Sequence, residues 1–227
     1  MKNTLIIAAV IAAIGLLPTS GVAAPKRTVA EHTIISRRDP AVDIRLPTSA
    51  QYVGTARFLL SQPTLGNTES CEQFAFVQPD NSREVVRAWW VQFEAYLPGH
   101  PNLHMTYDSL RHANIGGLDF YVDAGVTSHS KRPKPGSDGA YFSSLLASHG
   151  YQRDDRMWVR FVHLVDAAKR KELMIIYTES LKSTTYSAAQ LGEGGVDHAR
   201  WAAMADQLIR RAEQSIDISS QNNPARE

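Results

Sequence analysis

The segment from Glu84 to Leu97 constrains the fold most, because its side chains alternate between two distinct faces. One face is apolar apart from Arg87, and it carries Val85, Trp89, Val91, Phe93, Ala95 and Leu97. The other face is amphipathic and carries Glu84, Val86, Ala88, Trp90, Gln92, Glu94 and Tyr96. A period of two over this length indicates a β-strand with one core face and one amphipathic face.

Other segments with strand or helix signals surround it. Strands are predicted over residues 32–36, 43–46, 52–60, 74–77 and 118–122, and a hairpin over 157–165 and 172–179. Helices are predicted over 139–149, capped by Ser137, and after Asp197, where an apolar stripe runs through Trp201, Met204, Ala205, Leu208, Ala212 and Ile216. A short helix is expected over residues 106–112. Because most strand connections are short, we predict an α+β sandwich, in which a largely antiparallel sheet packs against helices and the amphipathic C-terminal helix.

The first 24 residues carry an export signal. Lys2 precedes an apolar run from Leu5 to Leu17, and small residues lead up to Ala23 and Ala24. This is the pattern of a secretory signal peptide cleaved after Ala23 or Ala24, and the apolar run is too short for a permanent membrane span. The sequence therefore predicts a signal peptide over 1–24, a single domain over 25–218 and a flexible tail over 219–227. We expect a periplasmic or secreted protein.

Charge and cysteine content narrow the class of partner. The chain has 24 Lys and Arg against 23 Asp and Glu, and only Lys2 falls in the signal peptide, so the mature chain is formally neutral. A neutral surface argues against a nucleic-acid partner. The single cysteine, Cys71, excludes a disulfide within the chain. We expect it to be a small buried residue, and the alternatives are an intermolecular disulfide or a reactive thiol.

Local catalytic motifs are absent from the sequence. It has no Gly-x-Ser-x-Gly, phosphate-loop, dinucleotide-binding, His-Glu-x-x-His or Cys-x-x-Cys pattern. This excludes the commonest local signatures but not a site assembled from distant residues. No cofactor is predicted.

Two groups of residues are candidates for a site. Aromatic, amide and carboxylate side chains on the amphipathic face are suited to line a ligand pocket or to pack under a helix: Trp90, Gln92, Glu94 and Tyr96. Three histidines in the following connector, His100, His104 and His112, are candidate zinc or copper ligands, with Met105 and Asp108 nearby. The alternative for the histidines is a polar surface connector.

Two further features have a structural and a functional interpretation. His163 falls on the apolar side of its strand, which favours a core histidine bonded to the backbone over a general base in a cleft. The loop 129–135 carries Lys131, Arg132 and Lys134, which fit a solvated loop or a contact with an anionic surface.

Together these features predict an exported, non-enzymatic domain of the cell envelope that binds a small molecule or a protein partner. The alternative is a periplasmic hydrolase with a His-centred or metal-dependent site. A third hypothesis is an envelope assembly factor that acts through the basic loop and the tail.

Overall fold

The computed structural model describes residues 27–220, so the predicted signal peptide lies outside the described residues, as do residues 221–227. Strands make up 47% of the described residues and helices 16%. The prediction of an antiparallel sheet packed against helices is confirmed at this level. The balance differs from the prediction, because the chain is mostly β and forms two sheets.

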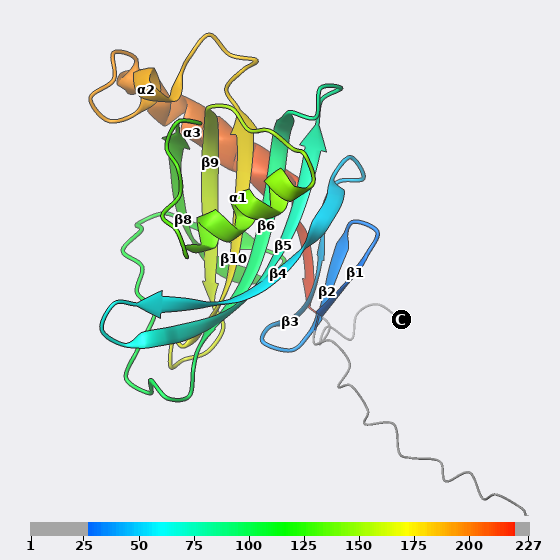
Figure 1. Ribbon diagram of the computed structural model, residues 1–227, viewed down its shortest axis with the longest axis vertical. Coiled ribbons are helices and arrows are strands. Elements are labelled where there is room, and N and C mark those ends of the chain that lie inside the picture. Colours follow the sequence, from blue (N-terminus) through cyan, green and yellow to red (C-terminus); the bar gives the residue numbers. More distant parts are fainter. Residues whose placement is uncertain (1–26, 221–227) are drawn as a thin grey trace, which may run out of the picture.

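The larger sheet has seven strands in the order β4-β5-β6-β10-β9-β8-β7, and every neighbouring pair is antiparallel (Figure 1). Its strands are β4 (Gln51–Gln62), β5 (Gly66–Pro79), β6 (Val85–Tyr96), β7 (His112–Ile115), β8 (Leu118–Thr127), β9 (Arg156–Leu164) and β10 (Lys171–Ser180). The predicted hairpin is present as the adjacent strands β9 and β10. β5 begins well before residue 74, where the sequence placed it.

The smaller sheet joins the two ends of the described chain. Its order is β1-β2-β3-β11, with β1 (Arg27–Ala30), β2 (Thr33–Arg37), β3 (Ala41–Arg45) and β11 (Asp217–Ser220). β11 pairs antiparallel with β3, and it extends two residues into the segment predicted as a tail.

Helices cover both faces of the larger sheet. α1 (Asp138–Ser148) crosses the face seen in front in Figure 1, where it contacts β4 and β5. α3 (His198–Gln214) lies behind the sheet against β8 and β9, and the short α2 (Ala188–Leu191) packs on α3. The predicted cap of α1 is confirmed, since the Ala140 amide donates to Ser137 Oγ at 3.3 Å. α3 starts after Asp197 as predicted, but the Asp197 side chain makes no capping bond.

Two apolar cores lie on the two faces, and the alternation along β6 divides between them. Trp89 packs with the smaller sheet and α3, and its indole Nε1 donates to Ser215 Oγ at 2.9 Å. Trp90 enters the other core, where its ring stacks on Phe142 of α1 with 4.9 Å between centroids. The two-faced strand predicted from the sequence is therefore confirmed.

The predicted helix over residues 106–112 is wrong, because tertiary contacts hold this connector in an irregular, open conformation. The Met105 amide donates to the Lys169 carbonyl at 2.8 Å instead of to a helical neighbour. Arg170, in the turn between β9 and β10, donates to the carbonyls of His100 and Leu103 at 2.6 and 3.0 Å. This clamp fixes the connector beside the start of β10.

One glycine allows the two sheets to meet. Gly116, in the turn between β7 and β8, has φ +61°, and a Cβ atom there would lie 2.0 Å from the Ile218 carbonyl oxygen of β11. Only glycine fits this contact without displacing β11. None of the helices formed by residues 27–220 is long and apolar enough to cross a membrane.

Candidate functional site

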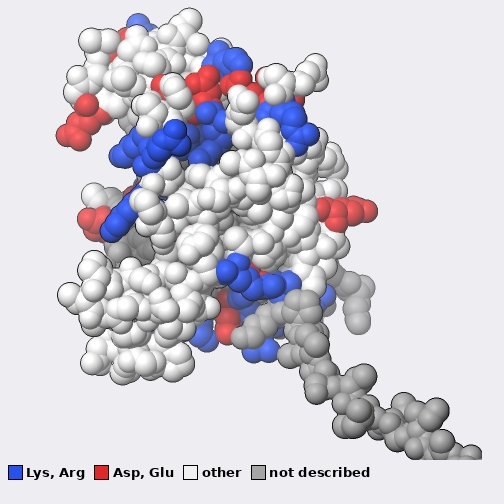
Figure 2. All heavy atoms as spheres, viewed as in Figure 1, with Lys and Arg blue, Asp and Glu red and all other residues white. Residues whose placement is uncertain are grey.

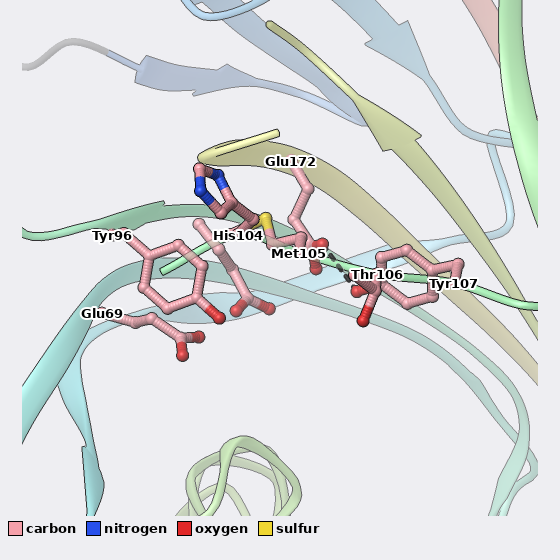
Figure 3. A pocket seen from close by; sticks show the side chains of 8 residues that line it. Glu69, Tyr96, His104, Met105, Thr106, Tyr107 and Glu172 are labelled. Carbon is pink, nitrogen blue, oxygen red and sulfur yellow. Dashed lines mark hydrogen bonds between the residues drawn. The ribbon is translucent and has the colours of Figure 1, made fainter. Parts of the chain in front are cut away.

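A cavity of about 220 Å³ opens on the α1 side of the larger sheet (Figure 3). Eight residues line it: Glu69, Glu94, Tyr96, His104, Met105, Thr106, Tyr107 and Glu172. We call this set the acidic pocket. Figure 3 shows that the Glu69 carboxyl and the Tyr96 hydroxyl point into the same space, with the connector holding His104 and Tyr107 at its edge.

Three adjacent strands bring the glutamates together. Glu94 of β6 pairs directly with Glu172 of β10, and Glu69 of β5 pairs with Tyr96. Side chains directly opposite on one face of an antiparallel pair have Cβ atoms about 5 Å apart. The strand register therefore places the carboxyl groups of Glu94 and Glu172 next to each other.

A row of buried amides orients Glu94. Gln92 Nε2 donates to Glu94 Oε1 at 2.6 Å. Gln92 Oε1 in turn accepts from Trp90 Nε1 and from Gln73 Nε2, both at 2.7 Å. This chain of donors fixes the carboxyl in buried surroundings, since Gln92 and Glu94 are both buried.

Glu172 has a tyrosine partner but no cationic one. The Tyr107 hydroxyl donates to Glu172 Oε2 at 2.6 Å, which is the dashed contact in Figure 3. Arg160 lies over the Tyr107 ring at 5.4 Å, but its guanidinium pairs with Asp123, with Nη2 2.5 Å from Oδ2. Arg160 therefore acts on Glu172 through its charge alone.

Burial and mutual repulsion hold these carboxyls toward their neutral forms. Burial raises the pKa of Glu172 to about 7, against the opposing effect of the Tyr107 hydrogen bond. Burial, and then the charge of Glu172, raise the pKa of Glu94 well above its usual range. Burial also raises the pKa of Glu69, and the hydrogen bond with Glu94 opposes this rise.

No cationic side chain of the described residues bonds directly to the pocket carboxyls, and Arg160 acts on Glu172 only at longer range. Within residues 27–220, no Lys, Arg or His side chain forms an ion pair with Glu69, Glu94 or Glu172. Glu94 is 8% exposed and Glu172 is 3% exposed, so water screens their charges poorly. An unpaired carboxylate in such surroundings is costly, and it is stabilised either by a proton or by a bound cation.

No family model, curated protein or solved structure matches the chain. The chemistry of the pocket therefore follows from its own residues.

Cys71 lies directly across from Glu94 in the strand register, on the same face of the sheet. Its side chain is buried and forms no disulfide, as expected from the sequence. Burial, and then the Glu94 carboxyl, raise the pKa of the thiol, which disfavours the reactive thiolate.

The candidate ligand residues occupy different parts of this site. Glu94 and Tyr96 line the cavity. Gln92 orients Glu94 from beneath, and Trp90 packs under α1. The sequence left open whether these side chains line a cavity or pack under a helix, and the strand has residues of both kinds.

The candidate metal ligands do not share one centre. His104 lines the pocket and its Nδ1 donates to the Ala168 carbonyl at 2.8 Å. His100 Nε2 donates to the Asn67 carbonyl, and His112 Nδ1 contacts Asp119 Oδ2, both at 3.0 Å.

A different group has the spacing of metal ligands. In the described part of the chain, one set of His, Cys, Asp and Glu brings its ligand atoms within 4.8 Å of one another, and it consists of His129, Asp154 and Asp155. His163 is half-buried, not a core residue as predicted, but its Nδ1 donates to the Asp119 carbonyl at 2.9 Å, which is the predicted bond to the backbone.

Sequence reasoning missed Glu69, Tyr107 and Glu172. Glu172 begins the second arm of the predicted hairpin, and a register for β6 and β10 would have placed it opposite Glu94. Glu69 was missed because the predicted strand began at residue 74. Tyr107 carries no local signal, since the Arg170 clamp decides where its connector runs.

Proposed function

We propose that the protein is an exported, non-enzymatic binding protein whose acidic pocket takes a small organic cation with at least one primary or secondary amine. The observation that carries this proposal is the group of three carboxyls, buried Glu94 and Glu172 and half-buried Glu69, that surround one cavity without an ion-pair partner in residues 27–220. The secretory pattern of residues 1–24 supports a location in the periplasm or outside the cell.

The spacing of the carboxyls favours an organic cation over a metal ion. Metal coordination requires ligand atoms that converge to about 2.0–2.6 Å from one point. The described group with closely spaced ligand atoms is the His129 set, not the pocket glutamates. An ammonium group with several N–H donors is suited to carboxyls distributed around it.

The other lining residues fit the same ligand class. Tyr96 and Tyr107 offer aromatic surfaces and hydroxyls, and Met105 offers a thioether, for the carbon chain that carries the amine. The volume of about 220 Å³ is below the usual range for drug-sized ligands, so it suits a short amine or one end of a longer one.

Calorimetric titration of the mature protein tests this proposal. The probe is 1,4-diaminobutane, and the uncharged control is 1,4-butanediol. The diamine should bind more tightly at pH 8 than at pH 5.5, because it competes with protons for the carboxyls, and binding should release protons to the buffer. Diol binding of equal strength, or the absence of diamine binding at pH 8, would contradict the proposal.

Two variants sharpen the assignment. Glu94→Gln should weaken diamine binding at least tenfold while the protein stays folded, since glutamine preserves the shape and the bond to Gln92. The matched control, Glu193→Gln, changes an exposed carboxylate and should leave binding unchanged. Equal effects of the two changes would point to a general charge effect.

A periplasmic hydrolase remains the second candidate because His104 borders the same cavity as Glu172. Burial raises the pKa of Glu172 to about 7, a value that suits general acid–base chemistry near neutral pH. The two candidates differ in turnover, since a binding protein returns its ligand unchanged. N-Acetyl-1,4-diaminobutane keeps one ammonium group and adds an amide bond that a hydrolase can cleave, so mass spectrometry of this compound after prolonged incubation with the protein distinguishes them.

A further inference from the structure

Two arginines, one at the start of β9 and one three residues before it, lack an ion-pair partner among the described residues. Arg153 and Arg156 are both half-buried, and neither forms an ion pair with any residue from 27 to 220. Arg153 Nη2 donates to Ser143 Oγ of α1 at 2.5 Å, and its guanidinium lies 5.6 Å from the centroid of the Phe142 ring. Arg156 Nη1 makes a long contact of 3.4 Å with the Asp154 carbonyl.

The two carboxylates between these arginines in the sequence, Asp154 and Asp155, accept hydrogen bonds from other groups. Asp155 Oδ1 accepts from the backbone amide and the ring Nδ1 of His129 at 2.9 and 2.8 Å, and Oδ2 accepts from the Ala188 amide at 2.9 Å. Asp154 Oδ1 accepts from the Asp155 amide at 2.7 Å. Asp155 therefore influences Arg156 through its charge but does not bond to it.

The basic loop adds to this positive surface. Residues 129–135 lead into α1, and the Pro133 side chain lies 3.6 Å from the position of a Cβ atom on Gly139 in the first turn of that helix. Figure 2 shows several Lys and Arg side chains on the upper part of this face, with Asp and Glu side chains among them.

Without a bound anion, the positive charges of the two guanidiniums repel each other. Burial, and then repulsion by Arg156, lower the pKa of Arg153 to about 10. Arginine pairs are favourable when an oxyanion bridges their planar N–H forks, since phosphoryl and sulfuryl oxygens accept two parallel hydrogen bonds. Surface lysines alone do not provide this geometry.

We propose that Arg153 and Arg156 form a binding site for a phosphoryl group, with the basic loop 129–135 as its outer edge. The site uses residues distinct from those of the acidic pocket, so a failure of amine binding would not contradict phosphoryl binding here. The phosphoryl group can belong to a soluble phosphate ester or to a phospholipid headgroup, which present the same oxygens to the arginines.

The test measures binding of inorganic phosphate to the mature protein by calorimetry and by the phosphate-dependent rise in Tm. Wild type should show saturable binding with about one site per chain. Arg153→Gln and Arg156→Gln should each weaken it at least tenfold, and Arg156→Lys should give an intermediate loss because the charge stays but the fork is lost. The control is Arg210→Gln, which removes an exposed arginine from α3 and should have no effect.

Stability without phosphate separates binding from a structural role. Because the arginines repel each other, Arg156→Gln should leave the Tm without phosphate unchanged or raised while it removes the phosphate-dependent rise. A lowered Tm without phosphate, together with wild-type phosphate affinity, would overturn the proposal. So would a wild type that does not bind phosphate, or equal losses in Arg210→Gln.

Vesicle sedimentation identifies the source of the phosphoryl group. If the ligand is a headgroup, the wild type should co-sediment with vesicles of phosphatidylglycerol in phosphatidylcholine, and Arg153→Gln should not. Phosphate binding without vesicle binding assigns the site to a soluble phosphate ester. Vesicle binding that Arg153→Gln retains at wild-type strength would contradict the proposed site.

Discussion

Replacing Glu172 with glutamine should stabilise the protein, and increasingly so as the pH rises. The change preserves the size of the side chain and leaves an oxygen to accept from the Tyr107 hydroxyl. It removes a carboxyl that is 3% exposed and has no ion-pair partner in the described part of the chain. Such a group lowers stability whenever it is ionised.

The magnitude follows from the shift in its pKa. Burial raises the pKa of Glu172 from 4.5 to about 7 in the folded state. Between these values the unfolded chain has lost the proton that the folded protein still holds, so the free energy of unfolding falls as the pH rises. The whole shift corresponds to a loss of about 3 kcal/mol, complete above pH 7 and absent below pH 4.5.

Urea denaturation of the mature wild type and Glu172→Gln at pH 4.5 and pH 8 measures this difference. The two proteins should have similar free energies of unfolding at pH 4.5, and the variant should be more stable by about 3 kcal/mol at pH 8. Glu193→Gln, which changes an exposed carboxylate, should show no such trend. A difference between Glu172→Gln and wild type that stays constant with pH would refute the reasoning.

Three further changes test other parts of the fold. Glu179 should behave oppositely to Glu172: burial opposes its ionisation, but a bidentate pair with Arg211, both bonds 2.8 Å, lowers its pKa. Glu179→Gln should therefore destabilise the protein by about 2–4 kcal/mol at pH 7. In the same denaturation assay, this destabilisation should disappear as the pH falls below 4.5. Asp155→Ala removes the acceptor of two backbone amides and should cost about 2–4 kcal/mol, with faster hydrogen exchange in the adjoining loops; unchanged exchange would refute this role. Gly116→Ala should lower the Tm far more than Gly66→Ala, because both glycines have positive φ but only Gly116 faces another strand; equal losses would contradict the proposed contact.

Alternation predicted β4, β6 and β9 of the larger sheet because each side chain there meets a consistent environment, whereas β7 (His112–Ile115) was not predicted as a strand. The faces of β6 and the cap at Ser137 depend on neighbours within a few positions, so local pattern identified them. The expected helix over 106–112 failed because Arg170, distant in sequence, binds the carbonyls of the connector. The smaller sheet was missed as a unit because β11 pairs with β3, more than 170 positions away.

The candidate site was predictable only where it lies on one strand. Glu94 and Tyr96 alternate with apolar neighbours, and this pattern marked them as pocket candidates. The other side of the pocket depends on the register that places Glu172 opposite Glu94, and on the hydrogen bond between Tyr107 and Glu172. Neither follows from composition or spacing along the chain. The histidines stood out by frequency, but their ring nitrogens bond to three separate groups.

The pairing of β11 with β3 sets the order in which this protein completes its fold. A chain synthesised from its N-terminus presents β1, β2 and β3 long before Asp217. Throughout that interval one edge of β3 is open, and open edges recruit strands from other molecules. Arrival of β11 closes the edge, and the tight contact at Gly116 then attaches it to the larger sheet. A truncated product that stops before Asp217 therefore retains an open edge on β3 that can pair with other molecules.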